Sequence, residues 1–260
     1  MFGNNQYWWL GLLMFLIFVG LNVIVFLLRK NPSLSYAVSY TIALYLLIFK
    51  TVEYTVYQIM GDHLNLPVEF STISYFVFGI AVVFKLKKID QFPVFTAILA
   101  GMIYGLAFWV SPDSYIIDKI STFDLVMAAI NHYSMYFAGM LMLANCRKYS
   151  PKYVWQFAIG VGLFVGYSYL IYLCTPYMQR PNAKIPIIIQ ITDCSILNWL
   201  SKDLVIVPWM KAVYYVCCGF ALCTFFACYY LLNRICMKKR VKAGLPEEYY
   251  AKNWRLTYNI

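Results

Sequence analysis

The chain has 260 residues, of which 62% are hydrophobic and only 12% are charged. A soluble domain contains about 45–50% apolar and about 25% charged residues, so this composition excludes an ordinary soluble protein and indicates a membrane protein. At about 20 residues for each crossing, nearly the whole chain fits into one helical bundle. The formal net charge of +10 lies mainly in loops and the tail, so it predicts contact with anionic membrane lipid and not with nucleic acid.

Seven segments are long and apolar enough to cross a bilayer. Proline-containing breaks separate several of them, as at Asn31-Pro32-Ser33 and Ser111-Pro112-Asp113. In chain order, the expected spans are Tyr7–Leu28, Tyr36–Met60, Leu66–Phe84, Phe92–Val110, Val126–Leu143, Tyr153–Cys174 and Trp209–Leu232. The sequence therefore predicts an all-α, polytopic transmembrane helical bundle of about seven spans over residues 1–233.

The basic residues gather in alternate loops. Fifteen of the 21 Lys and Arg residues lie after the first, third, fifth and seventh spans, and five lie in the loops on the other side. Cytoplasmic loops carry the excess of positive charge. We therefore expect the N-terminus outside and the C-terminus in the cytosol, in a bacterial plasma membrane. The basic, aromatic tail, residues 234–260, is expected either to lie on the membrane surface or to be flexible.

The longest loop on the outer side, residues 175–208, contains the apolar run Ile185-Pro186-Ile187-Ile188-Ile189, which is too short to cross. We expect a re-entrant or surface-lying segment here. Cys174 and Cys194 can pair only if that side is oxidising. The sequence contains no His/Cys cluster with metal-site spacing and no nucleotide motif, so no metal or cofactor is predicted.

Polar and ionisable residues at membrane depth are costly and are by default candidates for function. The second, third and fifth expected spans carry several of them at similar depth. With a rise of about 1.5 Å per residue, all but one lie about 5–10 Å below the outer surface. The set comprises Glu53, Glu69, Ser71, Thr72 and His132, with Lys50 nearer the midplane.

These residue types suit nucleophilic catalysis. A Ser71 or Thr72 hydroxyl is a weak nucleophile unless a base such as His132 takes its proton, and a carboxylate can orient that base. Glu53 is the preferred orienting residue, and Asn131 can donate a hydrogen bond to an oxyanion. At about 100° per residue, positions 69 and 72 share a helix face whereas 69 and 71 do not.

Each of these residues also has a purely structural interpretation. With Pro67 at the first helical position, Glu69 would stand at the third, where its negative charge interacts favourably with the helix dipole. The two hydroxyls can bond to backbone or allow close helix packing. Lys50 and Glu53 are three apart on one helix and can neutralise each other. The imidazole of His132 can simply bridge two helices.

Two segments resemble a known family. Leu66-Pro67-Val68-Glu69-Phe70-Ser71-Thr72-Ile73-Ser74 resembles the Leu-Pro-Leu-His-Leu-Cys-Ser-Ile-Ser signature of the YwaF-type integral membrane proteins. Ala129-Ile130-Asn131-His132-Tyr133-Ser134 resembles the histidine-bearing helix that follows about 60 residues later in that family. Asn198-Trp199-Leu200 is similar to its Asp-Trp-Leu element before the last span.

The resemblance implies a place near a superfamily that includes androgen-induced-gene-type lipid hydrolases and a phospholipid acyltransferase. It puts Ser71 where the family's cysteine stands and His132 where its histidine stands. Two departures matter: serine is a poorer nucleophile than cysteine, and Glu69 replaces a second histidine.

Three functions follow as hypotheses. The leading one is a lipid-directed hydrolase or acyltransferase with Ser71 or Thr72 as nucleophile and His132 as base. The second is a proton-coupled small-molecule transporter or binding protein that uses Lys50, Glu53 and His132 as a relay. The third is a non-enzymatic accessory protein of the membrane. Of these three, only the hydrolase or acyltransferase needs a hydroxyl group that can be acylated.

Overall fold

The computed structural model describes residues 7–61, 66–110, 122–179, 185–194, 197 and 207–249, and in these ranges the chain forms helices and no strands. Asn198-Trp199-Leu200 and the tail beyond residue 249 lie outside the described residues. The helices are α1 (Trp8–Leu27), α2 (Pro32–Ile59), α3 (Phe70–Val83), α4 (Gln91–Val110), α6 (Thr122–Leu141), α7 (Trp155–Cys174), α8 (Ile187–Thr192) and α10 (Pro208–Lys242). A π-turn, Met142–Cys146, extends α6.

Within the described residues, six helices are long and apolar enough to cross a membrane. The expected third span is represented by α3, which has 14 residues. At about 1.5 Å per residue it is about 21 Å long, shorter than the roughly 30 Å hydrocarbon core. Prolines set several starts, because Pro32 and Pro208 stand at the first helical positions of α2 and α10.

The expected position of Glu69 at the third residue of a helix is wrong. The structure begins α3 at Phe70 and puts Glu69 at the N-cap, in extended conformation. The extended residues before α3 instead contact α7, where the Val68 carbonyl accepts a hydrogen bond from the Ser168 hydroxyl at 3.3 Å. A carboxylate at the N-cap still lies by the positive end of the dipole.

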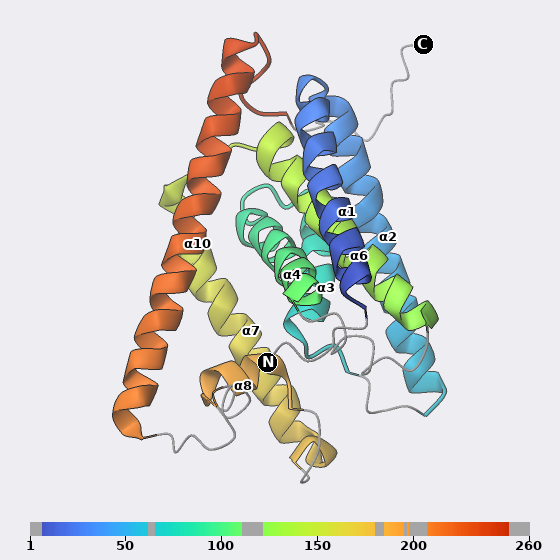
Figure 1. Cartoon of the computed structure of the whole chain (residues 1–260), viewed down its shortest axis with the longest axis vertical. Helices are drawn as coiled ribbons and strands as arrows, with labels where there is room; N and C mark the ends of the chain where they lie inside the picture. The colour runs from blue at the N-terminus through green and yellow to red at the C-terminus, as the bar shows by residue number, and fades with distance from the viewer. Residues whose placement is uncertain are drawn as a thin grey trace.

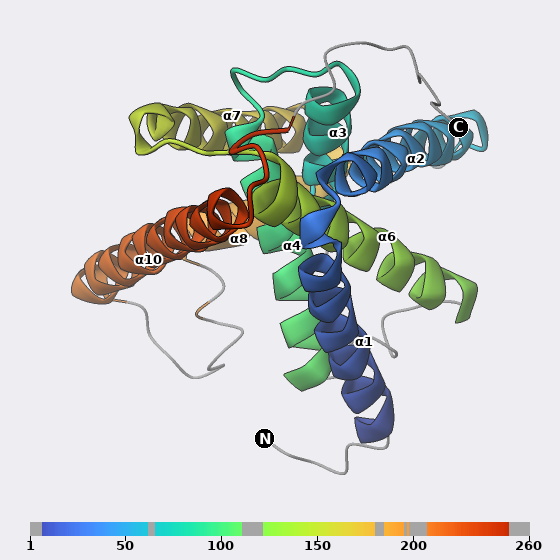
Figure 2. The same cartoon turned by 90° about the horizontal axis from the view of Figure 1, so that it is seen from above.

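The long helices alternate in direction, so the loops rich in Lys and Arg meet at one end of the bundle (Figure 1, upper end). We call this the basic end. Hydrogen bonds confirm that these loops lie together. The Arg147 side chain donates to the Lys87 carbonyl, and the Asn145 side chain donates to the Val25 carbonyl. Seen from above, α7, α10, α1 and α2 point in different directions away from the centre (Figure 2). The helices therefore splay apart below the basic end.

The core lies between α2, α3, α4 and α6, and glycines allow their backbones to approach closely. Gly101 of α4 packs on α6, where an added Cβ would lie 2.6 Å from the His132 carbonyl oxygen. On the other side of α6, the Ser39 hydroxyl of α2 bonds to the Ala138 carbonyl at 3.1 Å. Small residues at such contacts are how membrane helices pack without a strong hydrophobic driving force.

The basic end is held by a buried polar cluster centred on Arg147, just after the π-turn. Its guanidinium bonds to both carboxylate oxygens of Asp90, at 2.8 and 3.3 Å, and the two side chains are 4% and 2% exposed. Arg147 also donates to Glu248. Asn233 of α10 bonds to the Leu143 and Arg147 carbonyls at 2.6 and 2.7 Å. These bonds fasten α10 to α6.

The segment after α10 folds back on the bundle as far as it is described. The helix continues through residue 233 to Lys242, beyond the apolar run. The Tyr249 backbone N–H then donates to the Cys146 carbonyl at 2.8 Å, and its ring packs edge-on against Tyr36. Residues 243–249 are thus bound to the bundle.

The segment between α7 and α10 is described in part, including α8. Thr192 of α8 is hydrogen bonded to Tyr169 of α7 at 2.9 Å, and its carbonyl accepts from Tyr215 of α10 at 2.7 Å. The six-residue α8 is far too short to cross a membrane. Cys174 and Cys194 are both free thiols, the first exposed and the second buried.

Candidate functional site

A partly buried polar cluster lies where α2, α3, α4 and α6 meet, toward the end opposite the basic end. It joins most of the residues that the sequence singles out, together with four tyrosines. We call it the His132 cluster, and its members are Tyr45, Lys50, Glu53, Tyr54, Thr72, Tyr75, Tyr104, Asn131 and His132.

His132 is clamped by three neighbours. Its Nδ1 atom lies 2.9 Å from the Tyr75 hydroxyl of α3 and 2.8 Å from the Ala128 carbonyl oxygen one turn earlier in α6. The Tyr104 ring of α4 stacks on the imidazole, with the centroids 4.0 Å apart and the planes 13° from parallel. The imidazole therefore has a fixed orientation between three helices.

The contacts of His132 bear on its tautomer. A carbonyl oxygen can only accept, so the Ala128 contact at 2.8 Å favours a proton on Nδ1, whereas a Tyr75 hydroxyl that donates to Nδ1 would favour the other tautomer. With the proton on Nδ1, the neutral ring carries its lone pair, and its basicity, on Nε2. Tyr75 is the second group at Nδ1 and can accept part of that N–H.

We expect nitrogen NMR of histidine-labelled protein in nanodiscs to show a protonated Nδ1 at His132. The chain has two histidines, and a His63→Gln variant leaves the His132 signal alone. Tyr75→Phe should shift this signal without exchanging the tautomer, because the Ala128 carbonyl remains. A neutral ring protonated only on Nε2 would contradict the expected tautomer.

Lys50 and Glu53 form the ion pair that their spacing predicts, with Nζ and Oε2 2.6 Å apart. The pair is directed toward the cluster, since the Lys50 ammonium lies 5.1 Å from the centre of the Tyr75 ring. That distance allows a cation–π attraction. The ion pair and His132 thus contact the same tyrosine, Tyr75.

The two hydroxyls of α3 differ in their surroundings. Thr72 is buried, and its oxygen accepts a hydrogen bond of 3.3 Å from the Tyr54 hydroxyl of α2. Ser71 is half-buried. The two hydrogen bonds of His132 Nδ1 join neither of them. The structure therefore brings Thr72 into the cluster through Tyr54, and not as a partner of Nδ1.

Asn131 is almost fully buried, and its side-chain oxygen accepts from the Tyr45 hydroxyl of α2 at 3.0 Å. This bond links α2 to α6 one residue away from His132. Asn131 therefore acts in the structure as a helix-to-helix bridge. Its position as a donor to a reacting oxygen stays a prediction.

Sequence reasoning missed the four tyrosines, above all Tyr75. A signal for Tyr75 was available, because it lies four residues after Ser71 and three after Thr72 and so adjoins both hydroxyls on α3. Tyr104 had no such signal. It reaches His132 only because Gly101, three residues earlier, brings α4 against α6.

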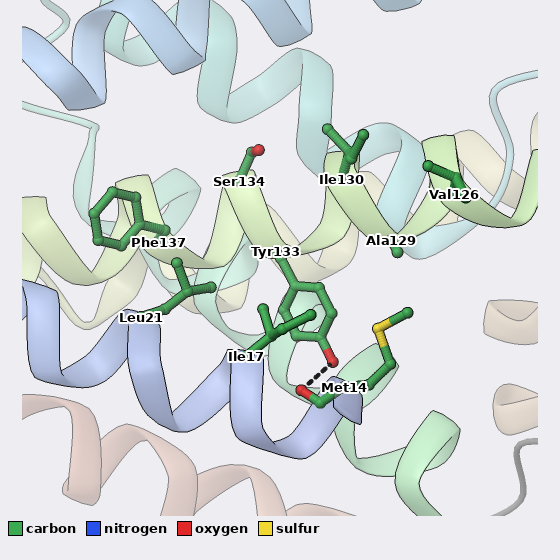
Figure 3. A pocket seen from close by; sticks show the side chains of 9 residues that line it. All are labelled: Met14, Ile17, Leu21, Val126, Ala129, Ile130, Tyr133, Ser134 and Phe137. Carbon is green, nitrogen blue, oxygen red and sulfur yellow. Dashed lines mark hydrogen bonds between the residues drawn. The ribbon is translucent and has the colours of Figure 1, made fainter. Parts of the chain in front are cut away.

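Ser134 belongs to a different surface. It lines an apolar groove of about 330 Å³ between α1 and α6, together with Ile17, Ile130 and Phe137. Figure 3 shows Tyr133 reaching across this groove to the Met14 carbonyl, a hydrogen bond of 3.0 Å. This groove is formed by α1 and α6, whereas the His132 cluster joins α6 to α2, α3 and α4.

The chain matches no family model, no curated protein and no solved structure. The class of this protein is therefore assigned from its fold and from the candidate site. The protein is an all-helical integral membrane protein with a half-buried cluster of ionisable side chains between its helices.

Proposed function

We propose that this protein carries out proton transfer within the membrane, with His132 as the proton carrier. The observation that carries the proposal is that ionisable side chains gather around one tyrosine: Lys50 pairs with Glu53, its ammonium lies 5.1 Å from the centre of the Tyr75 ring, and the Tyr75 hydroxyl contacts His132 Nδ1. The contact of Lys50 with the ring couples charge and carries no proton. Proton-coupled binding or transport of a small molecule fits this arrangement best.

Compensation of the charge on protonated His132 supports this proposal. An imidazolium in a membrane needs nearby groups that compensate its charge. Glu53 supplies a negative charge that Lys50 balances while His132 is neutral. When His132 takes a proton on Nε2, the ring becomes positively charged, and Glu53 is the carboxylate of the cluster that is available to compensate that charge. Tyr75 and Tyr104 keep the ring in place throughout.

The second candidate is the lipid-directed hydrolase or acyltransferase. Thr72 favours it, because this hydroxyl lies one turn from Tyr75 and is already hydrogen bonded within the cluster. The resemblance of residues 66–74 and 129–134 to the YwaF-type family supports the same proposal, with Ser71 as the nucleophile. In either case we place the protein in a bacterial plasma membrane, with the basic end in the cytosol.

The test is proton flux into vesicles of phosphatidylethanolamine and phosphatidylglycerol that contain the purified chain and a pH-sensitive dye. A potassium gradient with valinomycin supplies the driving potential. We expect the wild type to acidify the lumen faster than protein-free vesicles do. His132→Ala and Glu53→Gln should fall to the protein-free rate, whereas Ser71→Ala should match the wild type.

Two outcomes would favour other functions. Equal flux in wild type and His132→Ala would reject the relay. Labelling of the wild type by a fluorophosphonate probe, lost in His132→Ala and in either Ser71→Ala or Thr72→Ala, would establish an activated nucleophile and support the hydrolase.

A further inference from the structure

A second polar site lies at the basic end, far along the chain from the His132 cluster. A cleft of about 930 Å³ opens between the last part of α10 and the segment that follows the π-turn (Figure 1, upper end of α10). Its charged lining residues are Lys148, Arg234, Lys238, Lys242 and Glu247. Four are basic and one is acidic, so the cleft has a positive charge.

The positive charge is concentrated on one face of α10. Arg234, Lys238 and Lys242 recur every four residues, which puts them in a row along the helix, and all three are exposed. Glu247 pairs at 2.5 Å with Lys148, which lines the same cleft, so these two charges offset each other and the row on α10 supplies the net positive charge. Among the described residues, no carboxylate forms an ion pair with any of the three.

The cleft has a rigid polar floor and an apolar wall. Asn233 is buried and fixed by its two bonds to backbone carbonyls, and it also lines the cleft. Leu231, Met237 and Val241 contribute apolar surface beside the basic row. A ligand that fits therefore has an anionic group for the row and a hydrocarbon part for the wall.

The position of the cleft along α10 identifies the source of such a ligand. The apolar length of α10 ends at Leu232, two residues before Arg234, and the exposed side chains Phe225, Leu231 and Leu232 precede the basic row. This is the level at which a membrane-spanning helix leaves the hydrocarbon core and meets the headgroups. An anionic phospholipid at this level has its phosphate beside the row and its acyl chains along the apolar part of α10.

We propose that this cleft binds the phosphate headgroup of an anionic phospholipid in the leaflet at the basic end. The basic row attracts the headgroup, the Asn233 side chain lies at its floor, and the apolar wall receives the upper part of an acyl chain. The site is independent of the proton-transfer function proposed above.

The experiment is a lipid titration of the full chain in a neutral detergent, read by native mass spectrometry. Phosphatidylglycerol is compared with phosphatidylcholine, which carries the same phosphate but no net charge. The cleft variant is Arg234→Gln with Lys238→Gln. The matched control is Lys30→Gln with Lys88→Gln, which removes the same charge from exposed residues at the basic end outside the cleft.

We expect phosphatidylglycerol to bind more tightly than phosphatidylcholine. The cleft variant should bind it about 25-fold more weakly, the product of about fivefold for each of the two basic residues removed near a membrane surface, and the control should bind as the wild type does. Equal weakening in both variants would overturn the proposal, because it would indicate a diffuse charge effect. Displacement of phosphatidylglycerol by millimolar inorganic phosphate would also overturn it, since the site would then recognise a free anion.

Discussion

Arg147→Ala is expected to lower the free energy of unfolding by about 3–5 kcal/mol, because it leaves the buried Asp90 carboxylate without its opposite charge. The bidentate contact at 2.8 and 3.3 Å, between side chains that are almost fully buried, is the reason for so large an effect. The variant also loses the bonds to the Lys87 carbonyl and to Glu248, which hold neighbouring segments at the basic end. The measurement is an SDS-unfolding titration in mixed micelles, followed by tryptophan fluorescence.

The matched control is the next residue in the chain. Lys148 also forms an ion pair, with Glu247 at 2.5 Å, but both side chains are about half exposed, at 53% and 52%. Exposed pairs contribute about 0–1 kcal/mol. Lys148→Ala should therefore unfold close to the wild type, and similar losses in the two variants would show that burial of the Arg147 pair is not what matters.

The free energy of unfolding of the Arg147→Ala variant should also depend on pH in a defined direction. Burial raises the pKa of Asp90 above its usual value, and the neighbouring Arg147 guanidinium opposes that rise. A carboxyl with a raised folded-state pKa stabilises the fold when protonated, and this stabilisation is lost as pH rises through that pKa. Without Arg147 the pKa rises further. The stability of the variant should therefore increase as the pH falls below neutral toward the raised pKa of Asp90, and a decrease in that direction would contradict the assignment.

Gly101→Ala is expected to disrupt the contact of α4 with α6 and with it the His132 cluster. A Cβ at residue 101 would lie 2.5 Å from the Tyr136 Cβ and 2.6 Å from the His132 carbonyl oxygen. The oxygen belongs to the helix backbone and cannot rotate away, so the helices must separate. Overpacking of this kind costs about 1–3 kcal/mol and sometimes more. The expected result is lower stability in the SDS titration and an altered His132 NMR signal.

Gly162→Ala is the control for Gly101. It makes the same change in the middle of α7, where nothing lies within 4 Å of the added Cβ. Alanine has the higher helix propensity, so the control should be neutral or slightly stabilising. If both variants lost stability equally, the cause would be a general intolerance of alanine at helical glycines, and not the approach of α4 to α6.

The helices themselves could be predicted from the sequence, because hydropathy and proline breaks act locally. The expected boundaries of α1 and α4 agree with the structure to within one residue. The start of α3 was placed too early, and the extended residues before it make a contact that no local pattern predicts, with Ser168 about 100 residues away in the chain. The continuation of α10 to Lys242 was missed because charged residues end a hydropathy signal without ending a helix.

The sites were predictable to a smaller extent. Ionisable residues within apolar spans identified Lys50, Glu53 and His132, which the structure links through Tyr75. The tyrosine was overlooked because it counts as apolar in a span. Asp90 and Arg147 were overlooked for the opposite reason: charges in loops are usually solvated, and these two meet in the interior only through folding over 57 residues.

Because the buried residues of α10 lie toward its C-terminal end, the helix can tilt about that end. Its buried residues, Tyr229 to Arg240, all lie in its second half, and the helix extends about 30 Å from there to Pro208. A tilt of about 10° at the fastened end would carry the far end through about 5 Å over that length. Tyr215 would take α8 with it through its bond to Thr192. A small rearrangement on one side of the membrane would thus be magnified into a displacement of the segment that covers the other.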